Sequence, residues 1–155
     1  DYGDDCGVEP STARAADGES SLRLWSAVQS EESDRWTALK SGWVVANAVS
    51  RTVEVEAGQA ILITARVHVP EDFEMTDRGA TLGLIGYDAD GKAVSRWTPG
   101  SIEVRGATAS DGWRRMMVGR IIPEQIAGVG VRLAVCGVGE CFFDEVRVRH
   151  GRARE

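Results

Sequence analysis

Polar and apolar residues alternate with a period of two over most of the chain between residues 20 and 150. The clearest case is the stretch 61–69, where every second residue is apolar: Ile61, Ile63, Ala65, Val67 and Val69. The same period recurs at 22–28, 129–136 and 142–149. A period of two is that of a strand with one buried and one solvated face, whereas a helix repeats every 3.6 residues. The sequence therefore predicts an all-β chain.

Turn signals separate these stretches. Asp88-Ala89-Asp90-Gly91 predicts a turn between strands over 80–87 and 92–97, because Asp and Gly tolerate the backbone angles of tight turns. Pro123 ends a further strand over 113–122. About eight or nine short antiparallel strands are expected in all. Such a pattern indicates a β-sandwich or a β-barrel.

The domain organisation is simple. A length of 155 residues suits one domain. Residues 1–19 have little periodicity and are expected to form an extended or partly ordered leader. Residues 20–150 are expected to form the β-domain, and residues 151–155 a frayed tail.

The charge balance excludes some partners. The chain has 18 Lys and Arg against 24 Asp and Glu, a net charge of -6. A nucleic-acid-binding protein usually shows the opposite balance, so we expect no nucleic-acid partner. No apolar run approaches the roughly 18 residues of a membrane-spanning helix, so no membrane span is expected.

The three cysteines leave at least one thiol outside any internal bridge. Cys136 and Cys141 flank the tetrapeptide 137–140. If that tetrapeptide is a hairpin loop, the two residues lie within disulfide distance. In an exported protein we then expect a Cys136–Cys141 bridge and a free Cys6. The alternative is that both are reduced thiols packed as small apolar groups.

Residues suited to catalysis are sparse. The two histidines are His68, in the middle of a predicted strand, and His150, in the terminal segment. No nucleophile-elbow, zinc-protease, Walker or C-x-x-C motif occurs. We therefore expect the chain not to be an enzyme.

Several segments together resemble a family. They are GESSLRL (18–24), SRTVEVEAGQAILITARVHV (50–69), LGLIGYDADGKAV (82–94), DGWRR (111–115) and FFDEVRV (142–148). In this order they resemble the strands of carbohydrate-binding-module jelly rolls, the galactose-binding-like β-sandwiches. The position after the small turn, usually aromatic in that family, holds Ala60-Ile61 here.

The resemblance implies a fold and two functions. The fold is an antiparallel jelly-roll β-sandwich of two sheets. The first function is a non-catalytic module that binds a glycan on a secreted or surface-displayed protein, outside or at the surface of a cell. Similar modules also occur on tail and capsid-surface proteins of bacterial viruses. The alternative is therefore a structural or decoration domain that contacts neighbouring subunits at a virion surface.

A structural calcium ion is also implied by the resemblance. In such modules an Asp at the start of the last strand, here Asp144, often helps to bind calcium with ligands near the first strands. Asp17 and Glu19 would supply those ligands. The alternative is that Asp144 accepts backbone N–H bonds and caps a loop. No other cofactor is expected.

Ligand contacts are expected on the outward face of a sheet or its bordering loops. A sugar needs an aromatic platform beside hydrogen-bonding groups, and five outward or rim positions offer both: Trp25, Arg66, His68, Tyr87 and Arg120. Residues of the opposite parity should form the core: Ile61, Ile63, Leu82, Leu84, Val131 and Leu133.

Arginines recur at outward positions of successive strands: Arg66, Arg120, Arg132 and Arg147. If these strands share a sheet, the arginines form a basic stripe suited to an acidic glycan. The alternative is a solvated face in which they pair with Glu54, Glu103 and Glu145, at roughly 0.2–1 kcal/mol for each pair.

Overall fold

The computed structural model describes residues 6–27, 46–71, 74–94, 102–104 and 112–152. These residues form antiparallel β-structure. Among them, the structure has no helix that is long and apolar enough to cross a membrane. The nine strands are β1 (Cys6–Ser11), β2 (Ser21–Ser26), β3 (Ala46–Val49), β4 (Val53–Glu54), β5 (Gln59–His68), β6 (Glu74–Tyr87), β7 (Ile102–Val104), β8 (Trp113–Ile121) and β9 (Gly128–Arg152). The expected fold class and strand number are confirmed.

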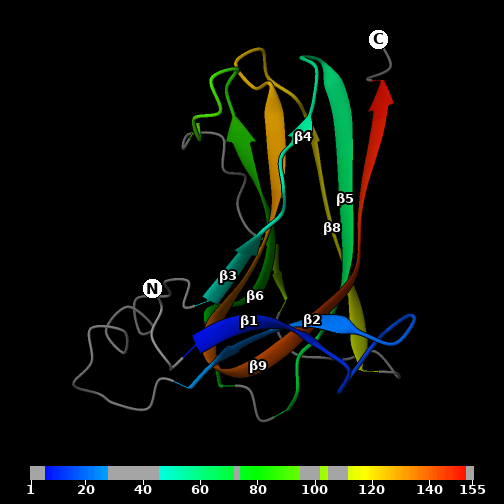
Figure 1. The fold of residues 1–155 in the computed structure, drawn as a ribbon, viewed down its shortest axis with the longest axis vertical. Coiled ribbons are helices and arrows are strands. Elements are labelled where there is room, and N and C mark those ends of the chain that lie inside the picture. The colour runs from blue at the N-terminus through cyan, green and yellow to red at the C-terminus, as the bar shows by residue number, and fades with distance from the viewer. Residues whose placement is uncertain (1–5, 28–45, 72–73, 95–101, 105–111, 153–155) are drawn as a thin grey trace, which may run out of the picture.

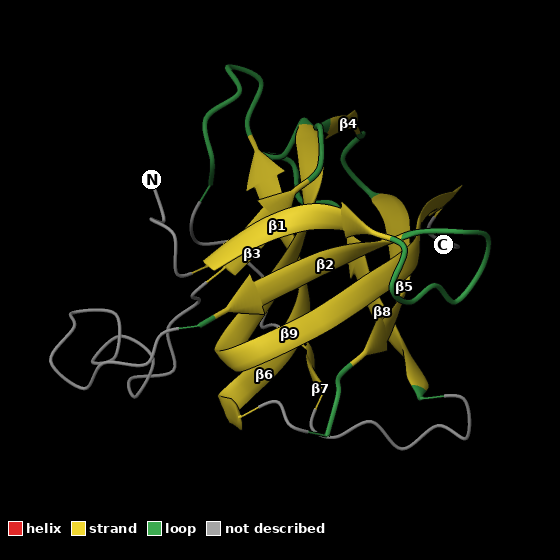
Figure 2. Cartoon of the chain, turned by 60° about the horizontal axis from the view of Figure 1, so that its bottom comes forward, coloured by secondary structure: helices red, strands yellow, loops and turns green. Residues whose placement is uncertain are grey.

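The strands form two layers. The first layer has the order β1–β2–β9–β5–β8, and Figure 2 shows β1, β2 and β9 side by side across its front. In the second layer β3 and β4 pair with one side of β9, β6 pairs with the other side, and β7 pairs with β6. This is a jelly-roll β-sandwich with one strand common to both layers.

β9 passes from one layer to the other. In Figure 1 it descends beside β6, bends at the lower end and rises beside β5. Its last partner in the second layer is Glu74, opposite Val138, and its first in the other layer is Ser26, opposite Gly139. Gly139 has a φ of 126°, which glycine tolerates far better than other residues. The glycine-containing stretch 137–140 is thus a bend within one strand.

This bend corrects the hairpin expected between two cysteines. Cys136 and Cys141 lie on one continuous strand, and no loop returns the chain between them. Cys6 and Cys141 are both buried thiols in the core. The proposed Cys136–Cys141 bridge therefore loses its geometric basis, and Cys141 packs as a small apolar group.

The core lies between the layers, where one face of each strand is buried. The six residues predicted to be core are all buried: Ile61, Ile63, Leu82, Leu84, Val131 and Leu133. Leu24 and Phe143 join them from the lower part of the first layer. Burial of each such side chain contributes about 1.5–3 kcal/mol. The alternation of polar and apolar residues therefore predicted these core residues correctly.

The two ends of the domain differ from the prediction. Residues 6–11 of the expected leader form β1, an edge strand paired with β2 along its whole length. Gly151 and Arg152, expected in the tail, pair with Ala60 and Gln59. The domain therefore includes more of the chain at both ends than the alternation indicated.

The turn expected at Asp88 is confirmed. The Asp88 side chain accepts hydrogen bonds from the N–H groups of Asp90 and Lys92, at 3.0 and 2.8 Å. Gly91 occupies the left-handed position, with a φ of 78°. The return strand predicted over 92–97 is reduced to one bridge between Tyr87 and Ala93, and its residues 95–97 lie outside the described part.

Candidate functional site

A row of five paired residues crosses the outer face of the first layer: Glu9, Arg23, Phe142, His68 and Trp113. Directly paired residues of an antiparallel sheet point to the same side, so these side chains share one face. Phe142, His68 and Trp113 are nevertheless buried. The outer face is therefore packed where the aromatic residues lie.

His68 is part of that packed row. Its Nδ1 lies 2.6 Å from the carbonyl oxygen of Gly112, and because a carbonyl only accepts, Nδ1 carries the proton. Its ring centroid lies 5.6 Å from that of Trp113 and 6.2 Å from that of Phe142. Only 8% of the residue is exposed, and within the described residues Nε2 has no hydrogen-bond partner. His68 is thus a packing residue with no open surface for a ligand.

Trp25 lies on the same face, two residues after Arg23 in β2. It is partly exposed, as we expected from its position on the outward side of the strand. The guanidinium carbon of Arg23 sits 5.7 Å from its ring centroid. A Cβ on Gly7 would lie 2.8 Å from its Nε1, so the indole rests against that glycine. Contacts within the sheet already use much of the ring surface.

Arg23 is fixed over the indole by two carboxylates. Its Nε donates to Glu140 at 2.6 Å, and its NH1 donates to Glu9 at 2.5 Å. Burial lowers the pKa of Arg23, but these two partners more than offset this and raise it above the usual value. The guanidinium is therefore a fixed part of the face.

Asp144 lies further along the same face, where it meets the loop between β1 and β2. Its Oδ2 accepts hydrogen bonds from the N–H groups of Ala16 at 2.7 Å and Asp17 at 3.0 Å, and its Oδ1 accepts one from Glu145 at 2.6 Å. Burial raises its pKa, but these bonds and the charge of Arg66 outweigh that effect and lower the pKa.

These bonds favour the capping role of Asp144 over the calcium role. Both of its oxygens face N–H groups, whose partial positive charge opposes a cation. In the residues that the structure describes, no group of three or more His, Cys, Asp or Glu is placed to hold a metal ion. Calcium bound by Asp144 with Asp17 and Glu19 therefore does not fit the geometry, and it stays a prediction for chelation to test.

The predicted arginine stripe is divided between faces. Arg66 and Arg147 lie near each other and share Glu145, at 3.6 and 2.6 Å, as the solvated-face alternative expected. Arg120 is paired with the core residue Ile61, so it belongs to the opposite face of the first layer. Arg132 lies in the second layer, opposite Gly83.

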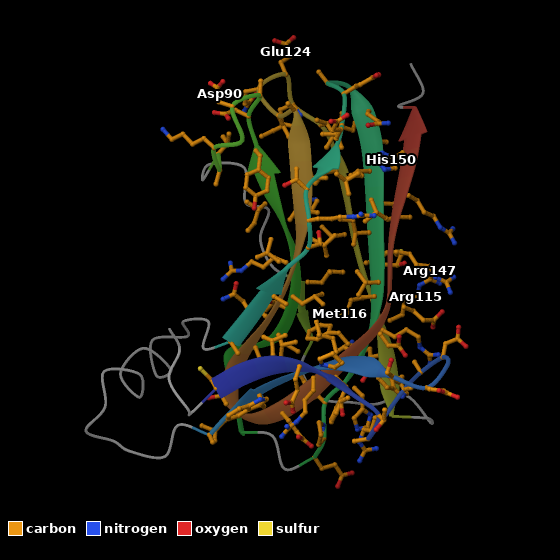
Figure 3. All side chains as sticks on the ribbon, viewed as in Figure 1. Asp90, Arg115, Met116, Glu124, Arg147 and His150 are labelled. Atoms are coloured by element: carbon orange, nitrogen blue, oxygen red, sulfur yellow. The ribbon has the colours of Figure 1, made fainter. Side chains whose placement is uncertain are left out.

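An open groove lies at the upper end of the molecule in Figure 3, beside the turn that carries Asp90. Its volume is about 1030 Å³. Three segments line it: the β4–β5 connection, the turn after β6, and the residues just before and at the start of β9. We call it the loop-end groove; its lining residues are Thr52, Glu54, Val55, Glu56, Ala57, Gly58, Gln59, Tyr87, Asp88, Ala89, Gly91, Ala127 and Gly128.

Tyr87 supplies the aromatic ring of the groove. A Cβ on Gly130 would lie 3.3 Å from its Cε2, so the ring lies close against the backbone of β9. A Cβ on Gly128 would lie 2.5 Å from Cγ2 of Thr52. Two glycines therefore let Tyr87 and Thr52 approach the backbone of β9 closely.

The lining has the chemistry of a sugar site. Glu54, Glu56 and Gln59 line the groove with Tyr87 and carry hydrogen-bond acceptors. Among the described residues that line it, none is Lys, Arg or His. Sugar hydroxyl groups donate to carboxylates, and the C–H face of a sugar ring packs on an aromatic ring. The groove therefore suits an uncharged, hydroxyl-rich ligand.

The five predicted contact residues do not form one site. Trp25, Arg66 and His68 share the outer face of the first layer, Arg120 lies on its other face, and Tyr87 lies in the loop-end groove. Sequence reasoning missed the groove residues Glu54, Glu56 and Gln59. They lie about thirty positions before Tyr87, and no local motif indicates that the chain brings them together.

Comparisons with known proteins agree with the fold. No protein-family model and no curated protein matches the sequence. Its structure is similar to the xylan-binding CBM22-1 domain of Paenibacillus barcinonensis Xyn10C, with 11% identity, coverage of 96% of this chain and 83% of that one, and a TM-score of 0.53. A family 16 carbohydrate-binding module is also similar, with 11% identity, coverage of 92% and 84%, and a TM-score of 0.58.

A third similar structure belongs to a larger protein. It is the enzymatically active domain of tailspike protein 4 of bacteriophage CBA120, at 14% identity and a TM-score of 0.58. The match covers 94% of this chain but only 18% of that one. Together the comparisons show that the chain has the β-sandwich fold of carbohydrate-binding modules, as the sequence motifs predicted.

Proposed function

We propose that this chain is a non-catalytic carbohydrate-binding module that holds an uncharged glycan in the loop-end groove. The observation that carries the proposal is the Tyr87 ring, which lies close to the backbone of Gly130 and lines the groove together with Glu54 and Gln59. An aromatic platform next to fixed acceptors is the arrangement that a sugar ring requires. The fold shared with xylan-binding and other carbohydrate-binding modules supports it.

The charge of the groove selects the glycan. Three carboxylates line it, Glu54, Glu56 and Asp88, and none of the described lining residues is cationic. An acidic sugar would meet like charge, whereas a neutral sugar donates hydroxyl hydrogens to the same groups. The proposed ligand is therefore a neutral glycan.

The proposal places the chain outside catalysis. Asp88 holds the turn through the N–H groups of Asp90 and Lys92, which leaves it little freedom to act as an acid or base. Within the part of the chain that the structure describes, no His, Cys or Lys lines the groove. The module would serve a secreted or surface-displayed protein by bringing it to a glycan.

Glycan-array binding tests the proposal. The parent should bind neutral glycans; Tyr87→Ala should weaken binding by about tenfold or more, while Tyr87→Phe keeps the ring and most of the affinity. Trp25→Ala tests the other predicted aromatic contact and should leave groove binding intact. Binding that survives Tyr87→Ala but is lost in Trp25→Ala would move the site to the first layer.

Substitutions that remove one negative charge refine the test. Glu54→Gln keeps the shape of the side chain but replaces a charged acceptor, so neutral-glycan binding should fall several-fold. Glu124→Gln is the matched control, because Glu124 is exposed at the same end of the molecule but does not line the groove (Figure 3). An equal loss in both variants would contradict the groove as the binding site.

A structural or decoration domain of a bacterial-virus particle is the second candidate. The similarity to a tailspike domain favours it, as do Met117 and Ile121, two exposed apolar residues on the edge strand β8. This candidate predicts self-association or docking onto a larger assembly, and no glycan binding. Sedimentation of the parent and of Ile121→Ser, together with the glycan array, separates the two.

A further inference from the structure

Four arginines lie on one face of the first layer: Arg66, Arg115, Arg147 and Arg149. Arg66 is paired directly with Arg115; Thr64, two positions before Arg66 on the same strand, is paired with Arg147; and Leu62 is paired with Arg149. Paired residues, and residues two apart on one strand, point to the same side. We call this surface the basic face; Figure 3 labels two of its residues, Arg115 and Arg147.

Carboxylates balance only part of this charge. Glu145 pairs with Arg66 and Arg147, and Asp144 adds one further negative charge near Arg66, so two carboxylates face four arginines. Within the described part of the chain, the structure gives no ion pair for Arg115 or Arg149. Arg66 and Arg115 lie directly opposite each other on neighbouring strands, a position in which like charges repel. The basic face is therefore positive on a chain whose net charge is -6.

Apolar groups lie among these arginines. Met117 is 52% exposed and Ile121 62% exposed, and the register places both on the basic face with the half-buried Leu62. An anion alone would need only the arginines. A chain of sugar rings that carries anionic groups would use both the charged forks and the apolar surface between them.

We propose that the basic face is a second binding site, for an anionic polysaccharide. Arg115 and Arg149 bind its carboxylate or sulfate groups, and Met117 and Leu62 pack against its sugar rings. The proposal rests on the proposed carbohydrate-binding function and adds a ligand class that the acidic loop-end groove would repel. The two sites then divide neutral from anionic glycans.

The borders of the basic face limit its ligand. The β1–β2 loop reaches Asp144 at one border and carries the exposed carboxylates Asp17 and Glu19. Anionic groups should therefore bind toward Arg115 and Arg149, away from that loop. A nucleic-acid duplex would present its phosphates and leave the apolar side chains of Met117 and Leu62 without a partner, which favours a polysaccharide over a nucleic acid.

Binding to polymers that share a backbone tests the proposal. Dextran sulfate and dextran differ only in sulfate, and polygalacturonate supplies the carboxylate arm. The parent should bind dextran sulfate or polygalacturonate more tightly than dextran. In Tyr87→Ala, which lacks the aromatic ring of the groove, the polyanions should still bind and dextran should not. The double variant Arg115→Gln/Arg149→Gln should lose about tenfold or more of that affinity, since two charged hydrogen-bonding partners are removed.

The matched control removes the same charge elsewhere. Arg120→Gln/Arg132→Gln changes the net charge equally, but Arg120 lies on the other face of β8 and Arg132 in the second layer. It should bind the polyanion as the parent does. Tyr87→Ala should also keep this affinity, so failure of the groove and failure of the basic face remain distinct.

Three results would overturn the proposal: no binding of either polyanion, an equal loss in both double variants, or tighter binding of duplex DNA than of the polysaccharides. Circular dichroism establishes that the variants are folded. Arg115→Lys/Arg149→Lys adds a second test, because it keeps the charge and removes the planar fork. Its affinity should fall between those of the parent and the Gln variant.

Discussion

Asp144 accepts a 2.7 Å hydrogen bond from the backbone N–H of Ala16, a residue 128 positions earlier in the chain. The same carboxylate holds Asp17 and Glu145. It thereby fastens the β1–β2 loop to the last strand, in addition to the direct pairing of β2 with β9.

Removal of this carboxylate should destabilise the fold. Asp144→Ala leaves three backbone N–H groups without their acceptor, and we expect a loss of roughly 1–3 kcal/mol in the free energy of unfolding. Denaturant titration of the parent and the variant measures it. Asp90→Ala is a control, because Asp90 is exposed and the side chain that accepts the N–H bonds of its turn is that of Asp88. An unchanged free energy for Asp144→Ala would contradict the capping role.

The same variant tests the calcium prediction. If Asp144 holds calcium with Asp17 and Glu19, a chelator should lower the melting temperature of the parent and leave that of Asp144→Ala unchanged. If Asp144 acts only as a cap, the chelator should change neither. The geometry favours the second outcome.

The stabilisation by Asp144 should depend on pH. Its pKa in the folded state is lower than the ordinary 3.8. A depressed carboxylate pKa gives stability that is complete above the unfolded-state pKa and is lost as the pH falls through the folded-state pKa. The parent should therefore lose stability relative to Asp144→Asn below about pH 4. Parallel denaturant titrations across that range measure the difference, and a constant difference would contradict the shift.

Gly112 should be among the least replaceable residues. It has a φ of 77°, and a Cβ there would lie 2.7 Å from the His68 ring, which Trp113 and Phe142 hold in place. Gly112→Ala should cost roughly 1–3 kcal/mol more than Gly58→Ala. Gly58 has the same backbone angle, 78°, with nothing within 4 Å, so it reports the backbone penalty alone. Equal melting temperatures for the two variants would show that His68 moves aside.

Another pair of glycines tests whether the position of the Tyr87 ring in the loop-end groove matters for binding. Gly130→Ala should displace the Tyr87 ring and weaken neutral-glycan binding several-fold, because the added Cβ would lie 3.3 Å from the ring. Gly83→Ala is the matched control: it lies on the neighbouring strand β6, and its Cβ would meet nothing within 4 Å. Equal binding by both variants would mean that the Tyr87 ring position does not matter to the ligand.

Alternation predicted the strands well because it reports one-sided burial directly. It failed where burial is not one-sided. β8 lies at the edge of the first layer, so Arg120 is exposed although it shares the parity of the buried Val118, and its polarity misled the assignment of its face. β1 is also an edge strand, and its Pro10 and exposed Glu9 hid it within the expected leader.

Two other errors have one cause, the distance along the chain between residues that meet. Gly137 and Gly139 resemble a hairpin turn locally, but the partners that keep β9 extended on both sides of the bend lie in β2 and β6. The loop-end groove likewise joins Glu54 to Tyr87 and Gly128. Only the tertiary structure brings such segments together.

β9 also sets the order in which this chain can fold during synthesis. β2, β3, β4, β5 and β6 all pair with it, yet it occupies residues 128–152. Neither layer can close on a ribosome-bound chain until those residues have left the exit tunnel, and the earlier strands must wait with their apolar faces uncovered. Non-local pairing of this kind slows folding. A nascent chain that stalls before residue 128 would therefore need a chaperone to cover those faces.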